Sequence, residues 1–263
     1  MSAISKDNPV TFTAVVFDLD GVVTKTALVH AAAWKAMFDE YLKKREQRDN
    51  EPFREFTHEK DYLPYVDGKP RYEGVRSFLE SRGIDITTGD PQDEPDRETV
   101  CGLGNRKNIK FREVLKSQGV EVYDSTVKLI HDLKAHGIRI GVASSSKNCQ
   151  YVLQAAGLED LFETRIDGVV SAETGLKGKP QPDIFVVAAK NLGAEPKQAI
   201  VVEDAVSGVQ AGRNGQFGLV IGLAREKNER DLKENGADVV ISDFAGVDSS
   251  SLEKWFRERQ NGA

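Results

Sequence analysis

From residue 124 onward, short apolar segments alternate with segments of helical character. Apolar segments typical of strands lie at 138–143, 166–170, 199–202, 218–221 and 238–241, and helices are predicted at about 125–136, from 148, at 182–192, through 211, near 229 and at 251–259. Strands that alternate with helices at this spacing form parallel sheets with right-handed crossovers. The sequence therefore predicts an α/β fold built on a parallel sheet.

One further strand is predicted near the N-terminus, where the apolar run at 14–17 ends in Asp18, Asp20 and Gly21. A mostly helical block of roughly 90 residues separates it from the next strand, which is far more than an ordinary crossover connection contains. The block contains predicted helices at 26–45, around Phe78 and at 100–118, with loops at 49–59 and 87–96. We therefore predict a Rossmann-like core, residues 1–27 and 119–263, and an inserted helical cap, residues 28–118.

Polar residues follow the ends of several predicted strands. They are the acids Asp18 and Asp20, the run Ser144, Ser145, Ser146, Lys147 and Asn148, and the pair Glu203 and Asp204; Lys179 precedes the helix at 182–192. Taken singly, each has an ordinary explanation as a turn, a helix cap, compensation of a helix dipole or a solvated side chain. Parallel strands bring their carboxyl ends to one edge, where these groups would meet. Clustered carboxylates repel one another, and Mg²⁺ prefers carboxylate, water and phosphate oxygen, so the pattern predicts a magnesium and phosphate site.

Composition narrows the class of protein. The formal net charge of −6 argues against a nucleic-acid-binding surface. Cys101 and Cys149 are too few and too isolated for a disulfide framework, and no apolar stretch has the length of a membrane span. We expect a cytoplasmic protein that contacts neither membrane nor nucleic acid.

The order of these motifs resembles the haloacid-dehalogenase superfamily and, within it, the β-phosphoglucomutase-like family, over nearly the whole chain. The residues that carry the resemblance are Phe17-Asp18-Leu19-Asp20-Gly21-Val22, Thr26, His30, Ala33-Trp34-Lys35-Ala36, Ala143-Ser144-x-Ser146-Lys147-Asn148, Lys179-Pro180-x-Pro182-Asp183-Ile184-Phe185 and Glu203-Asp204. The resemblance implies a phosphotransferase whose cap closes over a phosphorylated sugar.

The resemblance also implies a role for each core residue. Asp18 would be the nucleophile that forms an aspartyl phosphate, and Asp20 the general acid and base. Mg²⁺ would be held by Asp18, by the Asp20 carbonyl and by the acidic pair Glu203 and Asp204. Ser144, the Ser145 amide and Lys179 would hold the transferring phosphoryl oxygens.

A second phosphate site is implied for the phosphate that is not transferred. Its residues would be Ser146, Lys147 and Asn148 of the core with Arg71 of the cap, in the specificity-loop pattern Gly68-x-x-Arg71. The segment Arg106-Lys107-Asn108 resembles one that faces the site. Thr26 and His30 would also belong to the substrate site, with His30 as a hinge or orienting group. A guanidinium suits a phosphate because it donates two parallel hydrogen bonds. A sugar bisphosphate is implied as an activating intermediate.

Two departures from the family pattern stand out. Lys25 occupies a position where the family usually has an acid, and Asp67 one where it has a lysine, so we expect the two to pair across the hinge. The cap also has extra loops at 49–57 and 89–98, so the resemblance does not determine which sugar is bound. We expect a monomer with β-phosphoglucomutase-like activity; a sugar-phosphate phosphatase using the same residues is the alternative, and a non-catalytic sugar-phosphate-binding protein is a third possibility.

Overall fold

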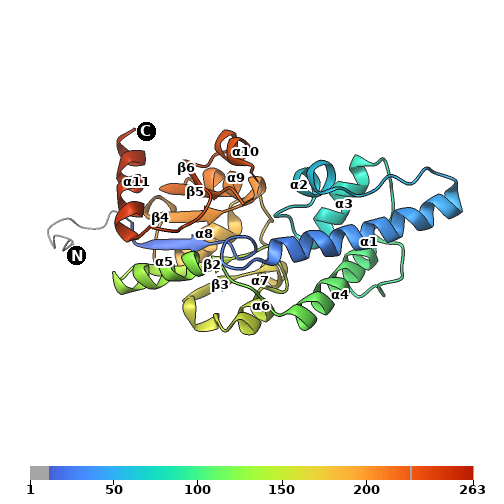
Figure 1. Ribbon diagram of the computed structural model, residues 1–263, viewed down its shortest axis with the longest axis horizontal. Coiled ribbons are helices and arrows are strands. Elements are labelled where there is room, and N and C mark those ends of the chain that lie inside the picture. Colours follow the sequence, from blue (N-terminus) through green and yellow to red (C-terminus); the bar gives the residue numbers. More distant parts are fainter. Residues whose placement is uncertain (1–11, 226, 263) are drawn as a thin grey trace.

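The structure is a computed structural model that describes residues 12–225 and 227–262. Its centre is a six-stranded sheet in the order β3-β2-β1-β4-β5-β6, and every pair of neighbouring strands is parallel (Figure 1). The strands are β1 (Ala14–Phe17), β2 (Arg139–Ala143), β3 (Thr164–Ile166), β4 (Ala199–Glu203), β5 (Leu219–Leu223) and β6 (Val239–Ile241). The predicted α/β class with a parallel sheet is confirmed.

Helices cover both faces of this sheet. They are α5 (Asp124–Ala135), α6 (Cys149–Ala156), α7 (Gly168–Thr174), α8 (Asp183–Asn191), α9 (Val206–Asn214), α10 (Glu229–Glu234) and α11 (Ser249–Asn261), with 3₁₀ turns at Glu159–Leu161 and Pro196–Gln198. Alternate residues of β1 face opposite sides, so Val15 and Phe17 join one apolar core with α5, α6 and α11. Val16 joins a second core with α8 and α9, which explains why β1 is apolar at every position.

Strand register brings the predicted site segments to one edge of the sheet. Phe17 lies opposite Val142 of β2 and Val202 of β4. The residues that follow these three strands are therefore neighbours in space, although more than a hundred positions separate the first from the second along the chain. This is the edge at which open parallel sheets bind their ligands.

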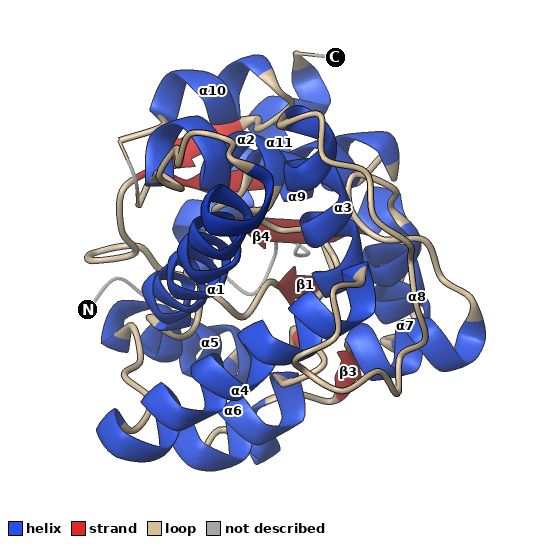
Figure 2. Cartoon of the chain, turned by 90° about the vertical axis from the view of Figure 1, so that its right-hand side faces the viewer, coloured by secondary structure: helices blue, strands red, loops and turns tan. Residues whose placement is uncertain are grey.

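The block between β1 and β2 packs around an apolar core of its own. It contains α1 (Thr26–Asp49), a π-helical turn (His58–Tyr62), α2 (Leu63–Tyr65), α3 (Arg71–Ser81) and α4 (Val100–Gln118). Phe38 lies at the centre, with ring centroids 4.1 Å from Phe78 and 5.1 Å from Phe56. Figure 2 views the molecule from this side, with α1 and α4 in front of the sheet. The division into a core and a cap at residues 27/28 and 118/119 stays a prediction.

Two segments join this block to the sheet side by side. The Lys25 amide donates to the Glu121 carbonyl at 2.9 Å, and the Tyr123 amide donates to the Val23 carbonyl at 2.9 Å. The predicted partner of Lys25 was wrong, because its ammonium group pairs with the Glu121 carboxylate at 2.8 Å. The two connecting segments are thus joined by backbone hydrogen bonds and by one ion pair between their side chains.

Two predicted boundaries were also wrong. The expected strand at 166–170 ends at Ile166, because Asp167 caps α7 by accepting hydrogen bonds from the amides of Val169 and Val170. The expected loop at 49–59 gives way at His58 to the π-helical turn.

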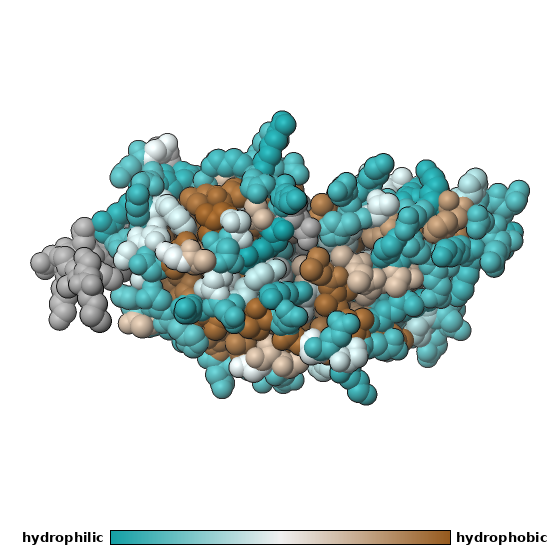
Figure 3. Space-filling view, viewed as in Figure 1, coloured by the Kyte–Doolittle hydropathy of each residue, from teal (hydrophilic) through white to brown (hydrophobic). Residues whose placement is uncertain are grey.

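Figure 3 shows a hydrophilic surface over most of the visible face, with smaller apolar patches between the polar residues. Among the helices that the structure describes, none combines the length and the apolar character that a membrane crossing requires.

Candidate active site

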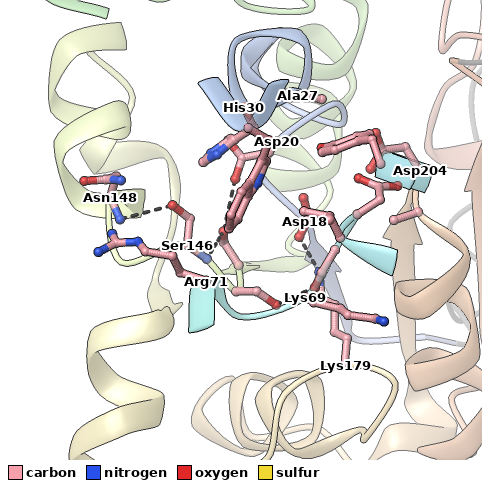
Figure 4. A pocket seen from close by; sticks show the side chains of 18 of the residues that line it. Asp18, Asp20, Ala27, His30, Lys69, Arg71, Ser146, Asn148, Lys179 and Asp204 are labelled. Atoms are coloured by element: carbon pink, nitrogen blue, oxygen red, sulfur yellow. Dashed lines mark hydrogen bonds and ion pairs between the residues drawn. The ribbon is translucent and has the colours of Figure 1, made fainter. Parts of the chain in front are cut away.

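A pocket of about 650 Å³, partly open to solvent, lies between the carboxyl edge of the sheet and the helical block. Every site residue predicted from the sequence lines it except Thr26, which reaches it through Asp20. In Figure 4, Asp18, Lys179 and Asp204 gather on one side of the pocket, and Arg71, Ser146 and Asn148 on the other. The strand ends thus bring together residues that lie far apart in the sequence.

Asp18, the first residue after β1, lies at the floor of the pocket and is 5% exposed. Lys179 donates to Asp18 Oδ1 at 2.5 Å and also to Glu203 Oε1. Burial raises the pKa of Asp18 well above its usual value in spite of Lys179, and Glu203 and Asp20 raise it further. Burial alone would lower the pKa of Lys179, but the two carboxylates outweigh burial and raise it. Lys179 is therefore a fixed cation between two acids.

Asp20 occupies a different environment from Asp18. Its carboxylate accepts from the Thr26 hydroxyl and from Ser144 Oγ at 3.3 Å, and its Oδ1 lies 3.3 Å from His30 Nε2. Burial would raise the pKa of Asp20, but His30 and Thr26 outweigh it and lower the value to about 2. The two aspartates therefore have opposite pKa shifts, as expected where neighbouring carboxyl groups perform different tasks.

The acidic pair after β4 is held by close packing. Glu203 Oε2 accepts from the backbone amides of Asp204 at 2.9 Å and Ala205 at 2.8 Å. A Cβ at Gly21 would lie 1.8 Å from Asp204 Oδ2, and Gly21 has a φ of +89°. Only glycine lets the β1 turn approach the Asp204 carboxylate so closely.

The residues at this edge suit a divalent cation. Burial, Glu203 and Asp67 raise the pKa of Asp204 well above its usual value, because Lys179 alone does not offset the neighbouring acids. Within the described part of the chain, no three His, Cys, Asp or Glu side chains already form a metal cluster. A Mg²⁺ site would need only one or two carboxylates, completed by a carbonyl, water and phosphate oxygen. Both oxygens of Glu203 already accept hydrogen bonds, so Asp204 is the better candidate of the pair.

The loop after β2 forms a hydroxyl and amide cradle. Ser144 Oγ accepts from the Ser146 amide at 3.0 Å, and Ser146 Oγ accepts from the Asn148 amide at 3.1 Å. Ser145 Oγ donates to the Gly68 carbonyl at 2.8 Å and so links this loop to the opposite wall. The predicted serines are thus brought together, each with a distinct contact.

The second group of predicted phosphate ligands meets at the far side of the pocket. Arg71 Nη2 donates to Asn108 Oδ1 at 2.8 Å, and Asn148 Nδ2 donates to the same oxygen at 2.7 Å. Lys147 Nζ lies 5.5 Å from the centre of the Tyr72 ring. Two cations and an amide therefore converge where an anion could bind.

His30 and Lys107 form a buried pair above Asp20. Lys107 Nζ lies 2.5 Å from His30 Nδ1, and His30 stacks on Phe111 with ring centroids 3.9 Å apart. Lys107 is 3% exposed, and burial, with Arg71, lowers its pKa well below the usual value. Burial and Lys107 also lower the pKa of His30. The predicted orienting role of His30 fits its position between Lys107 and Asp20.

Comparison with known proteins decides the family. The model of the haloacid dehalogenase-like hydrolases matches residues 12–216. The chain belongs to this family. A protein named β-phosphoglucomutase from Mycobacterium bovis is 47% identical over 235 residues, which cover 88% of this chain and 90% of that protein. Another of that name, from Bacillus subtilis, is 31% identical over 94% of this chain and 96% of its own.

Solved structures of haloacid dehalogenase-like proteins share the fold. A β-phosphoglucomutase from Clostridium difficile superimposes with a TM-score of 0.74 at 24% identity and covers 95% of this chain and 99% of its own. Together, these similarities support an enzyme with phosphotransferase or phosphatase activity.

Two residues near the pocket, Arg112 and Tyr72, had no place in the sequence analysis, whereas Asn108 lies in the cap segment that was expected to face the site. Asn108 accepts from Arg71 and Asn148, and Arg112 Nε donates to Asn148 Oδ1 at 3.0 Å. Asn108 and Arg112 are four positions apart on α4 and so lie on one face of the helix. That spacing is the sequence signal that could have joined Arg112 to the site.

Proposed function

We propose that this protein is a Mg²⁺-dependent phosphosugar mutase that converts β-glucose 1-phosphate to glucose 6-phosphate through an aspartyl phosphate on Asp18. The observation that carries the proposal is a single pocket with two anion-binding sides. Asp18, Lys179 and Ser144 form the transfer side, whereas Arg71, Lys147 and Asn148 form a distal side. A mutase needs both, because its intermediate is a bisphosphate. The names of the relatives support this choice.

At the transfer side, Asp18 is the group placed to attack phosphorus. Lys179 fixes one oxygen of its carboxylate at 2.5 Å. Asp18, Asp204 and the Asp20 carbonyl would hold Mg²⁺, which supplies charge neutralisation for the carboxylates and the phosphoryl oxygens. Lys179 and the Ser144 hydroxyl would stabilise the charge on the transferring group from fixed positions, at no cost of reorganisation during the reaction.

Asp20 would move the proton. With a pKa of about 2 it is ionised at neutral pH and takes the proton from the accepting sugar hydroxyl. When Asp18 carries the phosphoryl group, the added negative charge raises the pKa of Asp20 and makes it a better base for this step. The proton then stays on Asp20 until Asp18 attacks the other phosphate of the bisphosphate, when Asp20 donates it to the leaving oxygen. His30 and Thr26 hold its carboxylate for both steps.

The contacts across the pocket would exclude water during transfer. Ser145 Oγ donates to the Gly68 carbonyl at 2.8 Å, and Ser207 Oγ donates to the Asp67 carbonyl at 3.2 Å. Both join the sheet edge to the loop that leads into α3, the helix that begins with Arg71. Exclusion of water favours transfer to a sugar hydroxyl over hydrolysis. A phosphatase with the same residues is the alternative that the experiment must separate.

The test supplies β-glucose 1-phosphate, Mg²⁺ and a trace of glucose 1,6-bisphosphate and follows the products. Glucose 6-phosphate supports the mutase, whereas free glucose with inorganic phosphate would establish the phosphatase, and binding without turnover a non-catalytic protein. Asp18→Asn should lower either activity by roughly 10³-fold or more, because the nucleophile is lost. Arg71→Ala should reduce mutase turnover far more than the hydrolysis of a small phosphate ester, which has no second anion to bind.

A further inference from the structure

A row of four polar side chains runs along the distal side of the pocket. Arg71 donates to Asn108 at 2.8 Å, Asn148 donates to Asn108 at 2.7 Å, and Arg112 donates to Asn148 at 3.0 Å. Asn148 precedes α6 at the sheet edge, whereas Asn108 and Arg112 lie on α4. The row therefore bridges the two parts of the molecule.

The chemistry of this row fixes the orientation of the Asn148 carboxamide. A guanidinium has donors and no acceptor, so Arg112 must face the carbonyl oxygen of Asn148. Asn108 Oδ1 accepts from Arg71, so the group of Asn148 that faces it must be the NH₂. Both neighbours thus demand the same orientation. One N–H of this carboxamide donates to Asn108, so the other N–H remains for an anion, whereas the opposite orientation would present an oxygen and repel it.

Arg112 itself stands outside the pocket. Asn148 is 2% exposed and lines the cavity, whereas Arg112 is exposed and does not line it. Its guanidinium carbon lies 5.8 Å from the centre of the ring of Tyr151, a residue of α6. Within residues 12–225 and 227–262, Arg112 forms its hydrogen bond through Nε alone.

We propose that Arg112 is a positioning residue for the distal phosphate site: its Nε–H holds the Asn148 carboxamide so that the NH₂ faces the anion. The inference rests on the proposed function, since it concerns the phosphate that is not transferred. It separates Arg112 from Arg71, whose guanidinium lines the pocket and would contact the phosphate directly. Because Arg112 lies on α4 and Asn148 lies at the sheet edge, the orientation of Asn148 then depends on how closely α4 packs against that edge.

Three substitutions separate hydrogen bonding from charge. Glutamine places its Nε2 on the same carbon that carries Nε in arginine, so Arg112→Gln keeps the donor and loses the charge. Arg112→Lys keeps the charge but moves the donor one bond further out, and Arg112→Met removes both. Lys116→Met is the matched control, because Lys116 is exposed on the same helix and loses the same charge.

Two measurements are made on each full-length variant. The first is the ratio of kcat/KM for β-glucose 1-phosphate to kcat/KM for acetyl phosphate, a small phosphoryl donor without a distal group. The second is the Kd of glucose 1,6-bisphosphate by calorimetry in an Asp18→Asn background. We expect Arg112→Met to lower the ratio and weaken the Kd by about tenfold each, mainly through KM. Arg112→Gln should stay within about twofold of the parent, with Arg112→Lys near Arg112→Met and Lys116→Met unchanged.

Different outcomes test the positioning role of Arg112 and the proposed mutase function. Three results would each overturn the positioning role. They are an Arg112→Met protein with the ratio and Kd of the parent, values restored by Arg112→Lys but not by Arg112→Gln, and an equal loss of kcat/KM on the two substrates. A parent enzyme that releases phosphate and forms no glucose 6-phosphate would overturn the proposed function alone, because the Kd series still tests Arg112. Absence of bisphosphate binding in the Asp18→Asn background would remove the distal site, and this inference with it.

Discussion

At the scale of single residues, Gly21 sets how closely the first strand end approaches the acidic pair. An added Cβ would lie 1.8 Å from Asp204 Oδ2. We expect Gly21→Ala to lower kcat/KM by about 100-fold, because a displacement of about 1 Å at a catalytic group has that effect. Gly137→Ala is the control, since Gly137 has a similar φ of +77° and open space around it. Both variants should lose roughly 1–2 kcal/mol of stability in urea titrations; equal activity in the two would contradict the role of Gly21.

Lys107 is a buried cation whose position costs stability. It is 3% exposed, and burial lowers its pKa well below the usual value. We expect Lys107→Met to raise the free energy of unfolding at pH 7 by about 1–3 kcal/mol while it lowers turnover. The unfolded chain binds the proton more tightly, so wild-type stability rises with pH up to the unfolded pKa of about 10.4, and the advantage of the variant should shrink over that range.

The control for this prediction is Lys116→Met, because Lys116 is exposed on the same helix. Its stability should stay within about 0.5 kcal/mol of wild type at every pH. Lys107 Nζ lies 5.0 Å from the centre of the Trp34 ring and 4.8 Å from that of Phe111. A Lys107→Met protein that is less stable than wild type would show that these ring contacts contribute more than burial of the lysine costs.

Residue-scale prediction from the sequence succeeds where a motif follows a strand directly. Asp18, Ser144 and Asp204 meet at the pocket because parallel register aligns the strand ends. Arg112 and Tyr72 do not follow a strand, and the spacing of Arg112 from Asn108 shows only that the two lie on one face of α4. Whether a helical arginine faces solvent or a neighbouring amide depends on how the helix is rotated in the packed fold, which its own sequence does not state.

At the scale of elements, α7 shows how a cap decides between strand and helix. Asp167 is 1% exposed, and its Oδ1 accepts from the amides of Val169 at 2.9 Å and Val170 at 3.0 Å. The Gly168 amide also donates to the Ser146 carbonyl at 3.2 Å, so the start of α7 supports the phosphate cradle. Two valines favour a strand, but an aspartate that satisfies two free amides favours a helix start. The wrong strand boundary follows from that competition.

Removal of this cap should therefore affect both stability and binding. We expect Asp167→Ala to lower the free energy of unfolding by about 1–2 kcal/mol and to raise KM for the sugar phosphate, because the Ser146 loop loses support. Asp167→Asn is the matched control, since an amide oxygen keeps the cap. The measurements are urea unfolding and steady-state kinetics; equal behaviour of the two variants would show that the cap itself is unimportant.

At the scale of the whole molecule, the helical block has an apolar core of its own, and Ala33, Phe111 and Leu115 of its helices also join the core on one face of the sheet. Phe38 and Phe78 belong to the core of the block, whereas Phe17 and Phe185 belong to the cores on the two faces of the sheet. An insertion of this size after the first strand was predictable, because no crossover needs so much chain. The partner of Lys25 was not, because Glu121 lies far along the chain and pairs with it only after the two connecting segments come together.

The acids at the sheet edge make the stability of the whole molecule depend on a cation. Asp204 is half-buried beside Glu203, Asp67 and Asp18, and desolvation together with these acids raises its pKa and opposes ionisation. In EDTA, Asp204→Asn should therefore be more stable than wild type by about 1 kcal/mol, because one buried charge is removed. Saturating Mg²⁺ should reverse the order: a concentration of 100 times Kd adds about 2.7 kcal/mol to a protein that binds only when folded, and the variant should gain less than a third of this.

Asp96→Asn, at an exposed position, should respond to Mg²⁺ like wild type. Urea unfolding of the three proteins in EDTA and in Mg²⁺ gives the comparison, and an equal gain in wild type and Asp204→Asn would place the cation elsewhere.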